Sequence, residues 1–243
     1  MLGTIPVLAL ALFAVAIVAN FGGFDADPAE SALFARTTNG PKAIPPGTTT
    51  TSIYYAQSVD TRPSNWPSKS SEQSATPLGR PAPFEAVAGA QHQFLARQRG
   101  GGSPVSYDPC RPIHYVTRPG GPENGDQLIR EAIDRLSRAT GFVFVDDGIT
   151  DEAPSNARLA VQPGVYGDRW APLLIAWSDA QESPMLENWG SSRDGDVVGY
   201  AGSYAAGIPG GKIAYVTGMV VLDGPDMATI LTRLENGRDV ARG

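Results

Sequence analysis

The chain has 243 residues, of which 42% are hydrophobic and 18% are charged, and its formal net charge is -6. Its 28 glycines and 21 prolines exceed ordinary usage, so the length predicts one folded domain together with low-complexity sequence. The acidic balance and the lack of a Lys- or Arg-rich block argue against nucleic acid as a partner. A single cysteine, Cys110, excludes an internal disulfide and a Cys-based structural zinc site.

The N-terminal segment is predicted to be a membrane anchor. Residues 2–24 carry no charged side chain, and about 20 apolar helical residues cross a hydrocarbon core of roughly 30 Å. The apolar run is longer than the core of a usual signal peptide, so residues 1–24 are expected to form one uncleaved transmembrane helix. A cleaved signal segment is the alternative. The expected location is the cell membrane, single-pass with the folded domain outside the cytoplasm, or else secretion.

Residues 25–104 are predicted to be a disordered linker. They are rich in Pro, Ser, Thr and Gly and show no sustained apolar periodicity, so they cannot bury enough surface to offset the entropy of ordering. A short stretch, residues 84–99, has helical spacing of its apolar residues and is expected to form a transient or docking helix. His92 lies in this stretch and is interpreted as a solvated linker residue.

Residues 105–243 are predicted to form one domain of the α/β (α+β) class. Apolar runs indicate strands at 113–117, 142–145, 173–177, 197–203 and 212–223. An amphipathic pattern indicates a helix over residues 125–140, with Gly141 after its end. A second helix is expected over residues 227–235, and Asn236 and Gly237 are expected to break it.

Several residues that could carry chemistry have a more ordinary structural interpretation. Ser203 lies in a Gly-rich run without a nucleophile-elbow motif and indicates an edge strand leading into a loop. Four acids could bind a hard cation but match no calcium-loop spacing and indicate a solvated turn: Asp146, Asp147, Asp151 and Glu152. Three tryptophans could line a pocket but are interpreted as core: Trp170, Trp177 and Trp189. His114 is interpreted as a packed strand residue, and Cys110 as a free buried thiol or half of a disulfide whose partner is missing.

A series of segments in fixed order resembles a known family. The series begins with YDPCRPIHYVTRP at 107–119, continues through REAIDRLSRATG and FVFVDDGITDE, and then runs through YGDRWAPLLIAWSD, VVGYAGS and YVTGMVVLD. Together these segments resemble the actinobacterial, membrane-anchored, matrixin-like zinc peptidases, which are a branch of the metzincins. The resemblance covers about residues 105–235.

This resemblance implies the N-terminal, upper half of a metzincin-like domain, a twisted mixed sheet with a backing helix. An edge strand would lie along the substrate cleft and pair with an extended peptide or protein substrate by β-augmentation. Its expected substrate-binding residues are Val198, Gly199, Tyr200, Ala201 and Gly202. The family also implies a zinc cofactor held by the motif H-E-x-x-H-x-x-G-x-x-H, whose glutamate is the general base.

That zinc-binding motif does not occur in the chain. Its two histidines, His92 and His114, cannot supply three ligands, so no catalytic or metal-binding residue is carried over from the family. Two interpretations remain open. The chain is a zinc metalloendopeptidase sequence that stops before the zinc-binding helix and is inactive as given, or it is a non-catalytic, surface-tethered domain that binds peptides or envelope components.

Overall fold

The computed structural model describes residues 54–55, 67, 72–83, 94–99, 102–186, 198–208 and 211–240. The predicted anchor at 1–24 and much of the predicted linker lie outside these residues, as do His92 and Trp189. Within the described ranges, no helix is both long and apolar enough to cross a membrane.

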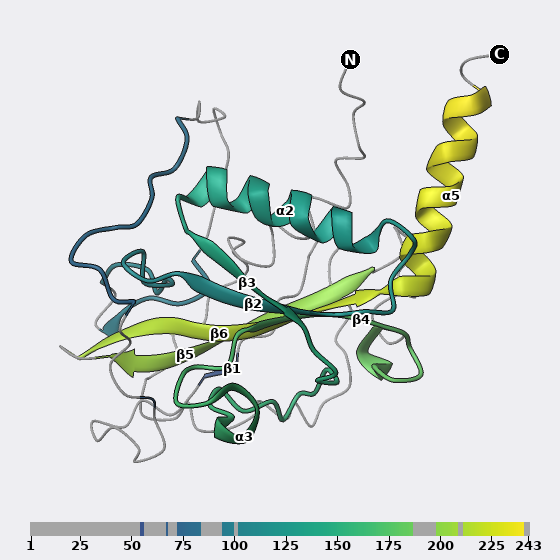
Figure 1. Ribbon diagram of the computed structural model, residues 1–243. Coiled ribbons are helices and arrows are strands. Elements are labelled where there is room, and N and C mark those ends of the chain that lie inside the picture. Colours follow the sequence, from purple (N-terminus) through teal and green to yellow (C-terminus); the bar gives the residue numbers. More distant parts are fainter. Residues whose placement is uncertain are drawn as a thin grey trace.

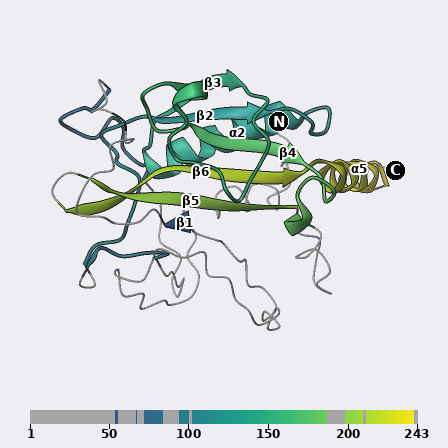
Figure 2. The same cartoon turned by 90° about the horizontal axis from the view of Figure 1, so that it is seen from below.

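A six-stranded sheet forms the centre of the fold, with the strand order β1-β5-β6-β4-β2-β3 (Figures 1 and 2). The strands are β1 (Tyr54–Tyr55), β2 (Ile113–Arg118), β3 (Phe144–Ile149), β4 (Leu173–Ser178), β5 (Gly199–Ile208) and β6 (Lys212–Asp223). Strands β3, β2, β4 and β6 are mutually parallel, whereas β5 is antiparallel to β6, and β1 is parallel to β5. This mixed sheet, together with its backing helix, confirms the expected α+β class.

Helix α2 (Gly125–Thr140) covers one face of the sheet (Figure 1). Its apolar residues recur at helical spacing, so the stripe that contains Ile129, Ile133 and Leu136 is buried in the main core. Gly141 follows in the left-handed conformation, with φ 74°, and its N–H donates to the Ser137 carbonyl oxygen. The helix therefore ends where the sequence predicted, because glycine adopts this conformation without steric cost.

The opposite face of the sheet carries a smaller apolar cluster. Its fully buried members include Leu174 and Ala176 on β4 and Val221 on β6. The long connection between β3 and β4 runs over this side of the sheet and contains the short helix α3 (Pro163–Tyr166), whose Tyr166 packs against the cluster (Figure 1). The central strands are thus buried on both faces, as their nearly continuous apolar sequence requires.

Strand β3 differs from the prediction for this part of the chain. A strand was expected at 142–145, followed by a turn at Asp146, Asp147 and Gly148, but all three of these residues lie within β3. Asp146 is opposite Tyr115 in the parallel pairing with β2, which satisfies backbone groups that a turn would leave to solvent. Both carboxylates have polar partners there: Asp146 accepts a hydrogen bond from the N–H of Gly148, and Asp147 pairs with His114 and Arg169.

Helix α5 (Gly224–Val240) is longer than expected and follows directly from β6 (Figure 1). The predicted break at Asn236 and Gly237 is wrong, because the helix continues through both residues. An internal glycine costs a helix only about 1 kcal/mol, which lowers its stability without ending it. The first turn is capped by Asp223, whose Oδ1 accepts a hydrogen bond of 2.9 Å from the N–H of Asp226.

Parts of the predicted linker pack against the domain. Residues 72–83 are held by backbone hydrogen bonds from Ser74 to Cys110, from Leu78 to Pro109 and from Ala82 to Arg138. Residues 94–99 form no α-helix; Arg97 instead makes an antiparallel bridge with Pro104. The packed part of the chain therefore includes residues on the N-terminal side of position 105, where the sequence placed the domain boundary.

Candidate functional site

Strand β5 is the outermost long strand on its side of the sheet (Figure 2). Its inner side pairs with β6 over all ten residues, from Gly199 opposite Leu222 to Ile208 opposite Lys212. Its outer neighbour, β1, is only two residues long and pairs with Tyr204 and Ala205. The prediction of a strand at 197–203 therefore located β5, which begins at Gly199 and extends to Ile208, but the two-residue β1 and not β5 is at the edge of the sheet.

The five predicted substrate-binding residues occupy the start of this strand. Gly199, Tyr200 and Ala201 are half-buried and Gly202 is buried, all within β5. Val198 precedes the strand, and its side chain is buried in the main core with 3% exposed. Its carbonyl oxygen accepts a hydrogen bond of 2.9 Å from the N–H of Asp223, so Val198 fixes the beginning of the strand.

Two glycines let β5 and β6 approach each other closely. A Cβ placed on Gly199 would lie 2.5 Å from the carbonyl oxygen of Val221, and one on Gly218 would lie 2.6 Å from that of Gly202. Real Cβ atoms do not make such contacts with backbone oxygen. Both positions thus require glycine for packing between the strands, and neither has a positive φ.

A buried tyrosine supports the middle of the β5–β6 pair from the α2 side of the sheet. Tyr107 is 6% exposed, and its hydroxyl donates a hydrogen bond of 3.1 Å to the carbonyl oxygen of Thr217 on β6. The same hydroxyl lies 3.3 Å from Oγ of Ser203 on β5. Burial raises the pKa of Tyr107 to about 12, although Ser203 and the positive charge of Arg158 oppose the shift. Ser203 therefore serves as a structural partner of Tyr107.

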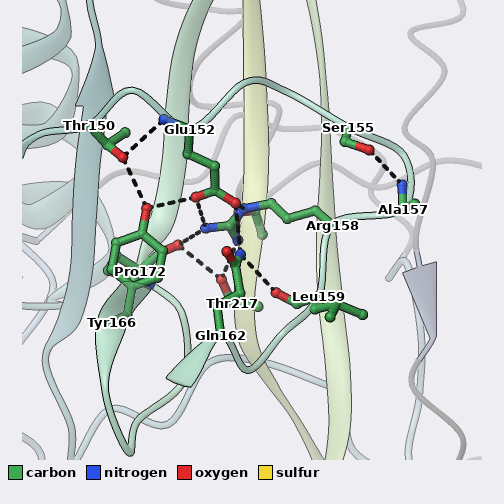
Figure 3. Close-up of polar contacts among 11 residues, drawn as sticks. Thr150, Glu152, Ser155, Ala157, Arg158, Leu159, Gln162, Tyr166, Pro172 and Thr217 are labelled. Atoms are coloured by element: carbon green, nitrogen blue, oxygen red, sulfur yellow. Dashed lines mark hydrogen bonds and ion pairs between the residues drawn. The ribbon is translucent and has the colours of Figure 1, made fainter. Parts of the chain in front are cut away.

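A buried arginine supports the same place from the other side (Figure 3). The guanidinium of Arg158 forms two hydrogen bonds with the carboxylate of Glu152, at 2.8 and 2.9 Å. It also donates to Oγ1 of Thr217 and to the carbonyl oxygens of Gly218 and Pro172, at 3.1, 3.2 and 2.9 Å. All five of its N–H donors are thereby used. The Arg158 side chain is 7% exposed, so this pair is a buried structural element.

The partner carboxylate of Arg158 is held by further donors. Oε1 of Glu152 accepts a hydrogen bond from the amide of Gln162, at 2.7 Å, and Oε2 accepts one from the hydroxyl of Tyr166, also at 2.7 Å (Figure 3). Burial alone raises the pKa of Glu152, but the hydrogen bonds from Arg158, Gln162 and Tyr166 outweigh it and hold the pKa below its usual value. The acid is therefore a charged anchor for the loop between β3 and β4.

Together, these contacts fix Thr217 from both faces of the sheet. Thr217 is opposite Tyr204, next to the irregularity in pairing between Tyr204 and Ala205. Tyr107 and Arg158 carry no sequence signal for this role, because each contacts Thr217 across about sixty residues or more and neither belongs to a local motif. Tyr107 and Arg158 therefore hold β6 in place, and β6 is the strand with which β5 pairs.

The histidine and two of the four acids considered for metal binding are engaged in ion pairs. His114 is on β2. Its Nδ1 lies 2.8 Å from Oδ1 of Asp147, and its Nε2 lies 3.1 Å from Oε2 of Glu72. Asp147 also pairs with Arg169, at 2.7 Å. The four acids considered together do not share one site, since Asp147 serves His114 whereas Glu152 serves Arg158. Across the described ranges, no group of three or more His, Cys, Asp or Glu side chains is arranged to hold a metal ion.

The remaining candidate residues have structural positions. Trp177 is 2% exposed in the main core, in agreement with its interpretation, and its indole lies against Gly121, in the loop before α2, and against Gly125, the first residue of α2. Cys110 is a half-buried free thiol in a turn. The backbone N–H of Cys110 donates a hydrogen bond to Oδ1 of Asp108. Desolvation and the Asp108 carboxylate raise the pKa of this thiol. The pKa shift therefore disfavours the reactive thiolate at Cys110.

Comparison with known proteins does not identify the chain. No model of a protein family matches it, and neither a curated protein nor a solved structure matches it significantly.

Proposed function

We propose that this protein binds extended peptides along the outer edge of β5. In this proposal, residues 105–235 are the peptide-binding half of a matrixin-like zinc metalloendopeptidase domain, tethered to a membrane by the N-terminal segment. The 243 residues of the chain then bind peptide without cleaving it. The observation that carries the proposal is the position of β5, a ten-residue strand whose only outer neighbour among the described strands is the two-residue β1.

A strand in this position offers main-chain donors and acceptors to an extended partner. In β-augmentation these groups supply affinity, and pockets for alternate side chains supply specificity. The small residues Gly199, Ala201 and Gly202 favour close approach of a second backbone. The contacts of Tyr107 and Arg158 with Thr217 support the strand from behind, so that little ordering of the protein is needed on binding.

The zinc implied by the resemblance does not fit the residues in hand. Within the described part of the chain, His114 is paired with two carboxylates, and the remaining histidine of the sequence, His92, lies outside that part. We therefore place no catalytic step on this chain. The non-catalytic, surface-tethered peptide- or envelope-binding domain remains the second candidate function, and it uses the same edge of β5.

Peptide binding can be tested without altering the protein, by scanning a peptide with N-methyl groups. The probe is a fluorescein-labelled decapeptide rich in valine and threonine, with a lysine at each end, titrated with the full chain by anisotropy. Alternate residues of a bound strand point their N–H groups to opposite sides, so one alternate set faces β5 and the other faces away. Methylation of the set that faces β5 removes hydrogen bonds to β5. We expect those methyl groups to weaken binding about tenfold or more, at a net value near 1 kcal/mol for each of the hydrogen bonds lost.

The control is the same peptide methylated one residue further along, which should bind as the parent peptide does. Equal losses at all positions, or no binding by the parent peptide, would contradict the proposal. A second assay with casein, with and without added zinc, tests the enzymatic interpretation. Chelator-sensitive cleavage by the purified 243-residue chain would overturn the proposal that it binds without cleaving.

A further inference from the structure

A segment of the chain itself already occupies part of the β5 edge. Strand β1 is parallel to β5, with Tyr54 opposite Tyr204 and Tyr55 opposite Ala205. These positions lie beside the irregularity in the β5–β6 pairing and opposite the part of β6 that contains Thr217. The segment 54–55 therefore uses main-chain groups of β5 at its most firmly supported point.

The length of chain that follows suits this arrangement. Residues 56–71 connect β1 to Glu72, which pairs with His114 on β2 at 3.1 Å. Strand β2 is four strands from β1, or roughly 19 Å at the usual spacing between strands. An unconstrained chain of about 16 residues has an average end-to-end distance of roughly 20–24 Å. The connection can thus span the distance. It keeps β1 at a local concentration on the order of millimolar at the β5 edge.

We infer that Tyr54–Tyr55 is an internal competitor for the peptide site, so that a peptide must displace this segment to occupy the whole edge of β5. The inference rests on the proposed peptide-binding function. A strand of two residues makes few hydrogen bonds, so it is displaced readily and lowers the apparent affinity without blocking the site. The partner that fits the surface is another extended segment that forms more main-chain hydrogen bonds than β1 does.

The test compares the full chain with the double variant Tyr54→Pro/Tyr55→Pro. Proline has no N–H and cannot donate to a strand ladder, so the double variant removes both N–H groups of β1, including the one that faces β5, and leaves β5 unchanged. The matched control is Thr49→Pro, which adds a proline to the same segment but outside β1. Two readouts are used: amide hydrogen exchange at residues 203–206 without peptide, and the apparent Kd for the decapeptide.

We expect the double variant to exchange faster at residues 203–206 and to bind the decapeptide roughly threefold to tenfold more tightly, whereas Thr49→Pro changes neither. Unchanged exchange in the double variant would overturn the pairing, and faster exchange with unchanged Kd would overturn the competition. Faster exchange without binding of the decapeptide to any form would instead contradict the proposed function. The exchange readout thus separates failure of the inference from failure of the function on which it rests.

Discussion

At the scale of single residues, Arg158 is the clearest structural anchor. Its guanidinium joins the loop between β3 and β4 to β6, and its side chain is 7% exposed. Arg169 is a natural comparison, because it also pairs with an acid, Asp147, but its side chain is 40% exposed. The two ion pairs differ mainly in burial, and burial decides how much the loss of one partner costs.

Arg158→Ala is therefore expected to lower the free energy of unfolding by about 3–5 kcal/mol, because it leaves the Glu152 carboxylate buried without its cation. Arg169→Ala should cost less than about 1 kcal/mol, as expected for an exposed ion pair. Urea denaturation of the two variants provides the comparison. Similar small losses for both would show that the Arg158 pair does not anchor the loop.

The same cluster predicts a dependence of stability on pH. The folded-state pKa of Glu152 is lower than its ordinary value of 4.5, so its contribution is complete above that pH and is lost as the pH falls through the folded-state pKa. Between pH 5 and pH 3, we expect the free energy of unfolding to fall less steeply for Glu152→Gln than for the natural chain. Parallel curves for the two proteins would contradict this assignment.

At the scale of elements, the close pairing of β5 with β6 depends on glycine at a few positions. Gly218→Ala should lower the free energy of unfolding by about 1–3 kcal/mol, because the new Cβ would meet the carbonyl oxygen of Gly202. Gly207→Ala is the matched control, since nothing lies within 4 Å of a Cβ placed there. A cost for Gly207→Ala equal to that for Gly218→Ala would mean that the strands are not packed in this way.

The elements that could be predicted from sequence are those with a complete local signal. The helix over 125–140 and the strand over 212–223 have the expected bounds, because an amphipathic stripe and a long apolar run define them. Asp146 and Asp147 are favoured in turns, yet pairing with β2 places them in a strand. Asn236 was expected to help end a helix, but the helix continues past it. In both places the observed fold overrides a local conformational preference that is worth under about 1 kcal/mol per residue.

For the candidate site, strand β5 could be predicted but its surroundings could not. The short, Gly-interrupted run that contains Gly199 and Gly202 indicates an edge strand on its own. The support of Thr217 by Tyr107 depends on a contact between residues far apart in the sequence, and strand β1 has only two residues. Neither feature has a periodic pattern, so only the folded arrangement reveals them.

At the scale of the whole molecule, the sheet has two outer sides that differ in character. The side at β3 carries Asp146 and Asp147 within a strand of six residues, and charged residues of this kind discourage further pairing. The side at β5 has ten residues, with glycine and alanine prominent among them. Under the proposed function, an extended partner therefore pairs on the β5 side of the sheet and not on the β3 side.

The most direct test of peptide binding at β5 is amide hydrogen exchange, resolved by residue with NMR on the full chain, with and without saturating decapeptide. The account predicts slower exchange at every second amide of Gly199–Ser203, with the amides of β3 unchanged as an internal control. Protection that falls on β3, or an exchange pattern of β5 that the bound peptide leaves unaltered, would contradict it.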